Sequence, residues 1–324
     1  MDIAVDIGYY TYSHTLPKKE VSLTELLKRR ELLKSTIRDF FSQLKYTEVD
    51  TPILSPYENP DDNVKNVKAT FEDFSGTKYS WFLHTSPEFF MKRLLIEGAE
   101  RIYQICKVFR NGEITELHSV EFTMVEWYRK GADYRVGIEE TLSLIRKCGQ
   151  AFGTKRGFYR GKVADLEEAE ILTVDEAFRE FADSSVFDEE KLLWLSGEES
   201  YESAFFKLLV EKVETGLSNI KKVVVLYDYP KEFGAFSKVR GDVAERFEVY
   251  IAGVEIANGY TEMTTYEEYR EKFKGNFDRR FLELLKKNPL PNSEGVALGF
   301  DRLLMVLTGA DRITEVIPFS TEEL

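Results

Sequence analysis

Two extended segments joined by a short polar loop constrain the fold of this chain most. The first covers residues 101–110 and ends at Arg110, and the second covers residues 121–129. Because side chains alternate along a strand, one face of the second segment carries a ring, a thioether, a carboxylate and a phenol: Phe122, Met124, Glu126 and Tyr128. Such a lining suits a nucleotide beside a cationic substrate. The alternative is an amphipathic hairpin with solvated charges.

Composition excludes several classes of protein. The 324 residues are 43% hydrophobic and 31% charged, which is typical of a globular protein. No apolar run reaches the roughly 18–20 residues of a membrane span, and the N-terminus lacks the pattern of a signal peptide. Cys106 and Cys148 have no metal-ligand spacing, so we expect reduced thiols and a cytoplasmic protein.

The net charge of −13 argues against nucleic acid as the main partner, because phosphate contacts need clusters of Lys and Arg. The three histidines form no cluster in the sequence, which argues against a zinc site.

Periodicity and capping residues divide the chain into alternating helices and strands. Helices are predicted at 22–44, 86–98, 136–153, from 173 and at 200–216, and after 300. Strands are predicted at 46–52, 82–85, 101–110, 121–129, 221–229, 246–251, from 254 and at 295–300, with a fragment at 67–71. Helices beside strands joined mostly by hairpins indicate an α+β fold around an antiparallel sheet.

Three of the helix starts carry capping signals. Ser22 to Glu25 fits a capping box, Ser86 precedes proline at the start of the next helix, and Thr173 begins the third. We expect an N-terminal extension over residues 1–20 and one catalytic domain over residues 21–324. A helical insertion is expected at about 136–218, because no Gly/Ser linker bounds that block.

A second hairpin offers two carboxylates. If Ala252-Gly253 is a two-residue turn, Tyr250 pairs with Glu255, and Glu248 pairs with Ala257. Glu248 and Glu255 then lie diagonally on one face, where both could hold Mg²⁺ together with substrate phosphates. The alternative is that both are solvated strand residues.

Asn258 and Glu262 follow on the same strand. Strict alternation places them on the face opposite Glu255, so they reach the same site only if the strand bends or bulges near Gly259.

The last strand, Gly295 to Phe300, leads directly into a helix with Arg302 in its first turn. Glycine allows a ligand to approach the backbone, and an arginine there can lie over a purine ring or pair with phosphate. Neither of the common glycine-rich phosphate loops is present in the sequence.

These three elements together resemble the class II aminoacyl-tRNA synthetases of the lysyl type. The resemblance extends from about residue 22 to the C-terminus, and the motifs that carry it are Tyr46–Pro52 with its preceding helix, Phe109–Arg129, Gly295–Met305 and the strand pair from Arg246 to Glu262.

The resemblance implies ATP and Mg²⁺ as cosubstrate and cofactor. ATP would be bound by Arg110, Glu113, His118, Phe122, Glu248, Glu255 and Arg302, with Mg²⁺ on Glu248 and Glu255. The amino acid would be bound by Glu88, Glu126, Tyr128, Asn258, Glu262 and Ala297. Arg110 and Arg302 would be catalytic, because the substrate carboxylate is itself the nucleophile and the phosphates need charge compensation.

Several positions depart from the lysyl enzymes. About 20 residues precede the first helix, too few for an anticodon-binding barrel, and Ala297 stands where those enzymes generally have glycine. Both features are similar to the lysyl-synthetase-like ligases that attach (R)-β-lysine to a lysine of elongation factor P. Gly112 occupies the place of a glutamate that normally contacts adenine, so we expect adenine recognition either to be loosened or to be carried by Glu113. Ser119 stands where asparagine is usual.

We therefore expect a cytoplasmic, homodimeric, AMP-forming ligase that activates lysine or (R)-β-lysine and transfers it to elongation factor P. The alternatives are an enzyme that charges tRNA, a non-catalytic paralogue that binds adenylate or amino acid, and an amide-forming metabolic synthetase. The net negative charge of the chain argues against the enzyme that charges tRNA. The residues expected to bind a side-chain ammonium argue against the metabolic synthetase.

Overall fold

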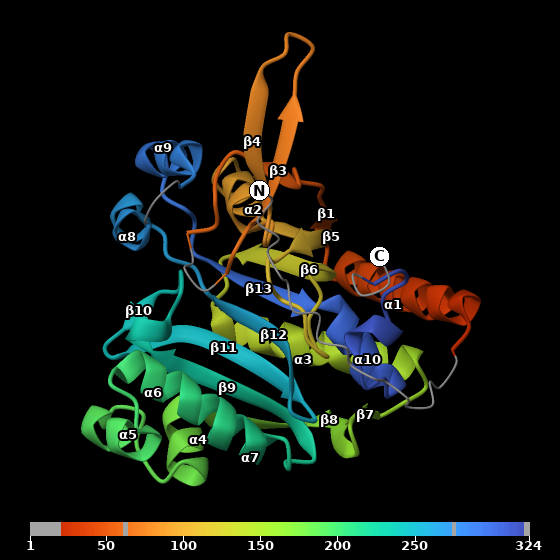
Figure 1. Ribbon diagram of the computed structural model, residues 1–324, viewed down its shortest axis with the longest axis vertical. Helices are drawn as coiled ribbons and strands as arrows, with labels where there is room; N and C mark the ends of the chain where they lie inside the picture. Colours follow the sequence, from red (N-terminus) through yellow and green to blue (C-terminus); the bar gives the residue numbers. More distant parts are fainter. Residues whose placement is uncertain (1–20, 61–63, 274–276, 321–324) are drawn as a thin grey trace, which may run out of the picture.

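The structure is a computed structural model that describes residues 21–60, 64–273 and 277–320. The predicted N-terminal extension, residues 1–20, lies outside the described residues. Figure 1 shows the arrangement of the elements: a large twisted sheet runs through the molecule, and a two-stranded arm projects from one end.

Ten strands form the main sheet in the order β1-β5-β6-β13-β12-β11-β9-β8-β7, with β10 paired to β11. Their bounds are β1 (Thr47–Glu48), β5 (Arg101–Phe109), β6 (Glu121–Lys130), β7 (Arg156–Tyr159), β8 (Lys162–Thr173), β9 (Lys222–Pro230), β10 (Val239–Arg240), β11 (Val243–Ile251), β12 (Val254–Thr261) and β13 (Ser293–Gly299). The β1–β5 and β8–β9 pairs are parallel and the other pairs are antiparallel. A small second sheet consists of β2 (Leu54–Ser55), β3 (Val67–Glu72) and β4 (Lys78–Leu83).

Helices cover the sheet and confirm the predicted α+β class. They are α1 (Leu23–Gln43), α2 (Glu88–Ile96), α3 (Tyr134–Ala151), α4 (Val174–Phe181), α5 (Glu189–Ser196), α6 (Tyr201–Leu208), α7 (Thr215–Leu217), α8 (Tyr266–Lys272), α9 (Arg279–Lys287) and α10 (Phe300–Thr308). A π-helical stretch, Leu209–Glu214, joins α6 to α7, and short 3-10 turns lie at Lys231–Phe233 and Ile313–Glu315.

The alternation predicted for β6 is confirmed. Val125 and Trp127 are fully buried in the core that α1, α3 and α10 form against the sheet. The intervening Met124, Glu126 and Tyr128 face a cavity on the opposite side. Apolar packing on one face of β6 therefore fixes which side chains reach the site on the other.

The turn at Ala252-Gly253 is also confirmed, but the register beyond it differs from the prediction. Tyr250 pairs with Glu255, whereas Glu248 pairs with Asn258 and not with Ala257. Ile256 is the extra residue, since Val249 pairs with Ala257. This β-bulge, three residues before the glycine at which we expected the bend, brings Glu255 and Asn258 to the same side of β12.

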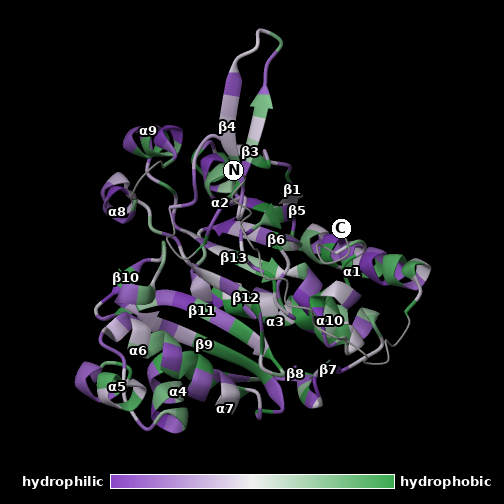
Figure 2. Ribbon diagram, viewed as in Figure 1, coloured by the Kyte–Doolittle hydropathy of each residue, from purple (hydrophilic) through white to green (hydrophobic). Residues whose placement is uncertain are grey.

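The predicted helical insertion at 136–218 is wrong in part. Strands β7 and β8 lie inside it and belong to the main sheet. Between Asp165 and Ala169 the register of β8 shifts against β9, which breaks the period-2 pattern that identifies a strand. The true helical part, α4 to α7, packs against β9 and β11 through a second apolar cluster. Figure 2 shows hydrophobic residues along β9, as the buried run Val223–Leu226 requires.

Two of the three capping predictions need adjustment. Ser22 caps α1 and accepts from the Glu25 amide, but the Glu25 carboxylate binds Arg29 instead of completing the box. Pro87, not Ser86, is the residue that precedes α2. The capping box at Thr173 is complete. Helices α5, α8 and α9 were not predicted; α8 and α9 pack with α2 around a third apolar cluster.

Candidate active site

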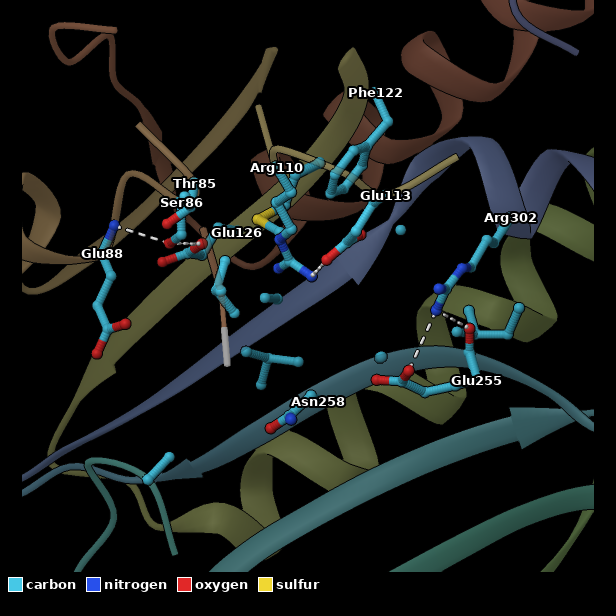
Figure 3. A pocket seen from close by; sticks show the side chains of 18 of the residues that line it. Thr85, Ser86, Glu88, Arg110, Glu113, Phe122, Glu126, Glu255, Asn258 and Arg302 are labelled. Atoms are coloured by element: carbon cyan, nitrogen blue, oxygen red, sulfur yellow. Dashed lines mark hydrogen bonds and ion pairs between the residues drawn. The ribbon is translucent and has the colours of Figure 1, made fainter. Parts of the chain in front are cut away.

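One cavity of about 300 Å³ lies on the face of the sheet formed by β6, β12 and β13. Of the thirteen residues predicted from the sequence, eleven line it: Glu88, Arg110, Glu113, His118, Phe122, Glu126, Tyr128, Glu255, Asn258, Ala297 and Arg302. Figure 3 shows that the cavity is polarised, with Glu88 and Glu126 at one end, Arg302 at the other, and Arg110 between them. Glu248 and Glu262 do not line it, although both are buried next to residues that do.

The acidic end is organised around Glu126. Ser86 Oγ donates to Glu126 Oε2 at 2.7 Å and accepts from the Glu88 backbone amide at 3.0 Å, so Ser86 ties the Glu126 carboxylate to the start of α2. Tyr128 OH donates to Glu126 Oε1 at 2.7 Å. Burial, together with the charge of Glu88, raises the pKa of Glu126 to about 7. A cation bound here would favour its ionised form.

Glu262 lies behind this end and is fully buried. Its Oε2 is 2.5 Å from Lys92 Nζ, and Lys92 also pairs with Glu88. Its Oε1 lies against Gly295, where a Cβ would collide with both Glu262 and the Tyr128 ring. The absence of a side chain at Gly295 therefore gives Glu262 a path toward the cavity.

The cationic end is organised around Arg302 in the first turn of α10. Its Nη1 donates to Glu255 Oε2 at 3.1 Å, its Nε donates to the Leu117 carbonyl at 3.2 Å, and its Nη2 lies 2.5 Å from His118 Nε2. Three partners therefore hold the guanidinium at the cavity wall, and Figure 3 shows the one with Glu255.

His118 is held neutral by its neighbours. Its Nδ1 is 2.7 Å from Thr115 Oγ1. Burial and the positive charges of Arg302 and Arg110 lower the pKa of His118 to about 4. A neutral imidazole can donate or accept a hydrogen bond beside a phosphate but supplies no charge.

Arg110 lies just beyond β5, between Phe122 and Glu113. Its Cζ is 5.2 Å from the centroid of the Phe122 ring, and its Nη1 is 3.9 Å from Glu113 Oε1. Arg110 Nε is buried without a hydrogen-bond partner among the described residues, as expected for a donor that awaits an anion. Gly112 has φ 83°, a conformation that favours glycine, so the turn itself accounts for the missing glutamate while Glu113 reaches the cavity.

Glu248 is engaged by its neighbours on the sheet. It accepts from Arg246 Nη2 at 2.6 Å and from Tyr250 OH at 2.5 Å, and Asn258 Nδ2 is 3.5 Å away. Burial and the charges of Glu248 and Glu255 raise the pKa of Glu214, at the end of the π-helical stretch, to about 7.

Within the described part of the chain no three acidic, histidine or cysteine side chains form a ready metal site. Two carboxylates fit Mg²⁺ here only in company with phosphates.

Sequence reasoning missed four residues of the site. Ser86 was interpreted as a cap only, and Lys92, Glu214 and Arg246 were given no role. Lys92 is four residues after Glu88 on a helix, a spacing that predicts an ion pair. No sequence pattern marks Glu214, because only the fold of α6 and its π-helical extension brings this residue to the sheet.

The fold and this polarised cavity define a class of protein. A family described as tRNA synthetases class II (D, K and N) matches residues 9–323, and the chain belongs to it. Similar proteins include the elongation factor P–(R)-β-lysine ligase homolog of Aquifex aeolicus, 37% identical over 89% of this chain and 97% of that protein. The elongation factor P–(R)-β-lysine ligases of Avibacterium paragallinarum and Vibrio cholerae are 34% and 35% identical over 94% and 95% of this chain, and over 98% of their own length.

These comparisons confirm both the expected class II synthetase fold and the expected resemblance to ligases that act on elongation factor P. In the described residues no helix has the length and apolar composition needed to cross a bilayer.

Proposed function

We propose that this chain is an AMP-forming ligase that activates lysine or (R)-β-lysine and transfers it to a lysine of elongation factor P. The observation that carries the proposal is the polarity of one cavity. Glu88 and Glu126 form an end suited to ammonium groups, while Arg302 at the other end and Arg110 between them are suited to phosphates. The names of the similar proteins support elongation factor P as the acceptor.

In the first step the substrate carboxylate attacks the α-phosphorus of ATP. A new bond forms between the carboxylate oxygen and phosphorus, and the bond to pyrophosphate breaks. Arg110 and Arg302 stabilise the charge on the phosphates, and Phe122 offers a flat face to the adenine ring, with Glu113 beside it. No general base is needed, because the nucleophile is already ionised.

In the second step a lysine amine of the acceptor attacks the carbonyl carbon of the adenylate. An amide bond forms, AMP leaves, and the amine loses a proton. Glu126, Tyr128 and Glu262 would hold the side-chain ammonium, with Glu88 near the substrate's other amino group and Asn258 near its carboxylate. Asn258 Oδ1 and Glu262 Oε1 are buried without a hydrogen-bond partner among the described residues, which supports a polar ligand here.

Mg²⁺ would be held by Glu248 and Glu255 together with the ATP phosphates, and when bound it would neutralise phosphate charge.

Ala297 pairs with Glu126 on the next strand, so its methyl group lies where it narrows the amino-acid end of the cavity.

Homodimerisation through α1 and β1 is part of the proposal. Leu23, Leu27 and Leu32 are exposed on α1, and β1 forms the edge of the sheet. Sedimentation at micromolar concentration should give twice the chain mass. We also place the enzyme in the cytoplasm, in keeping with its two free thiols.

ATP–pyrophosphate exchange tests the activation step. Strong exchange with lysine or (R)-β-lysine, and little with norleucine, is the expected result, because norleucine lacks the side-chain ammonium. No exchange with either lysine isomer would contradict the proposal, and efficient charging of tRNA would favour the alternative acceptor.

A further inference from the structure

Lys92 is an unusual feature of the cavity's acidic end. Its side chain is fully buried on α2, and its ammonium pairs with Glu88 and with Glu262, 2.5 Å from Glu262 Oε2. Four aromatic rings, those of Phe89, Phe236, Tyr260 and Tyr269, surround it with their centroids 5.3–5.8 Å from Nζ. Such a cage stabilises a cation that has lost its water.

The titratable groups around this end come from four elements. They are Glu88 and Lys92 on α2, Glu126 and Tyr128 on β6, Tyr260 on β12 with Glu262 directly after that strand, and Tyr269 on α8. Tyr260 OH donates to Glu88 Oε1 at 2.9 Å, and the tyrosines are neutral because burial raises their pKa. The charges that remain are three carboxylates and one ammonium.

Three negative charges against one positive leave a net charge of −2 when all four groups are ionised. A diamino acid such as lysine or (R)-β-lysine brings two ammonium groups to this end, while its carboxylate points toward the arginines. The charge of the pocket therefore matches a diamino acid and exceeds what an amino acid with one ammonium group needs.

We propose that Lys92 is a positioning residue whose buried ammonium, paired with Glu88 and Glu262, sets the charge of this pocket to that of a diamino acid. Lys92 pairs with one oxygen of Glu88 and one oxygen of Glu262, so the other oxygen of each carboxylate is left for the substrate. The inference rests on the proposed function, since it assumes that the cavity binds such an amino acid.

The physical reason is the cost of burying like charges together. Without Lys92 the pKa of Glu262 would rise further, since burial raises it to about 8 even against the opposing effect of Lys92. At pH 8 the empty pocket would then be protonated to a greater extent than in the wild-type protein, and binding of a diamino acid would have to expel that proton.

Calorimetric titration of lysine at pH 8 in two buffers of different ionisation enthalpy measures that proton directly, with no turnover required. The wild-type protein should release only a fraction of a proton, because the pKa of Glu262 is about 8 and that of Glu126 is about 7. Lys92→Met, which keeps the length of the side chain without its charge, should release more than the wild-type protein and bind lysine at least tenfold more weakly.

The double variant Lys92→Met/Glu262→Gln is the matched control, because it removes one positive and one negative charge and restores a net charge of −2. Its proton release should fall back to the wild-type value or below, since the titrating carboxyl of Glu262 is gone, and it carries the test if Lys92→Met alone does not fold. A purely structural Lys92 would weaken binding without changing the proton count, and that result would overturn the inference.

The two proposals fail in different ways. If the wild-type protein binds neither lysine nor (R)-β-lysine, the proposed function falls and the inference with it. If it binds lysine but proton release is the same in all three proteins, only the inference is overturned.

Discussion

Arg302 and His118 are joined by a contact of 2.5 Å between Nη2 and Nε2. A guanidinium has no acceptor, so the imidazole must accept, and Nδ1 must carry the ring proton. That proton is directed at Thr115 Oγ1, 2.7 Å away. Arg302 therefore fixes the tautomer and favours the neutral state of the histidine beside the proposed phosphates.

His118 should not titrate near the ordinary histidine value. Burial and the charges of Arg302 and Arg110 lower its pKa to about 4, so the neutral form is favoured in the folded protein. The contribution of this group to stability is present above pH 6.5 and is lost as the pH falls from about 6.5 through about 4. NMR titration of the nucleotide-free protein measures the midpoint. Arg302→Ala should raise it, and a wild-type midpoint near 6.5 would contradict the described contact.

Removing the guanidinium of Arg302 should impair activation strongly. In Arg302→Ala, kcat/KM for pyrophosphate exchange should fall about 10²- to 10³-fold, the usual cost of losing a donor that stabilises transition-state charge. Arg29→Ala is the control, because that arginine is partly exposed and its ion pair among the described residues is with Glu25, one turn away. Equal activity in both variants would remove Arg302 from the mechanism.

A methyl group at Gly295 should damage the amino-acid end selectively. It would collide with Glu262 and the Tyr128 ring, at a cost of about 1–3 kcal/mol for overpacking. We expect Gly295→Ala to raise the KM for lysine at least tenfold with little change in the KM for ATP. Gly299→Ala, four residues along β13, places its methyl in ordinary contact 3.6 Å from Arg302 and should leave the KM for lysine unchanged. Parallel changes in both variants would contradict this geometry.

Glu255 should influence the requirement for Mg²⁺. Chelation of the metal should abolish exchange, and Glu255→Gln should raise the Mg²⁺ concentration for half-maximal rate by about 10- to 100-fold, as perturbation of a metal site commonly does. Glu121→Gln is the control, since that carboxylate is exposed and pairs with Lys107. Full exchange after chelation would exclude Mg²⁺ from the proposed step.

Much of the site was predictable because it lies on regular elements. The alternation along β6 identified Glu126 and Tyr128, and the strand-to-helix transition identified Arg302. These patterns are local, so they can be recognised without knowing which strands pair with one another.

The remainder depends on irregularities and on distant contacts. The bulge at Ile256 decides that Glu255 and Asn258 share a face, yet nothing in the sequence marks its position. Lys92 is charged and on a helix, where exposure is the usual outcome. Only the packing of α2 against β12 and α8 shows that it is buried.

Transfer to protein is the central claim, and intact mass spectrometry of elongation factor P tests it most directly. The acceptor is incubated with this enzyme, ATP, Mg²⁺ and either (R)-β-lysine or lysine, and its acceptor lysine is replaced by arginine in a parallel sample. The account predicts a gain of one lysyl or β-lysyl residue in the first sample and none in the second. Pyrophosphate exchange without any gain of mass on elongation factor P would contradict it.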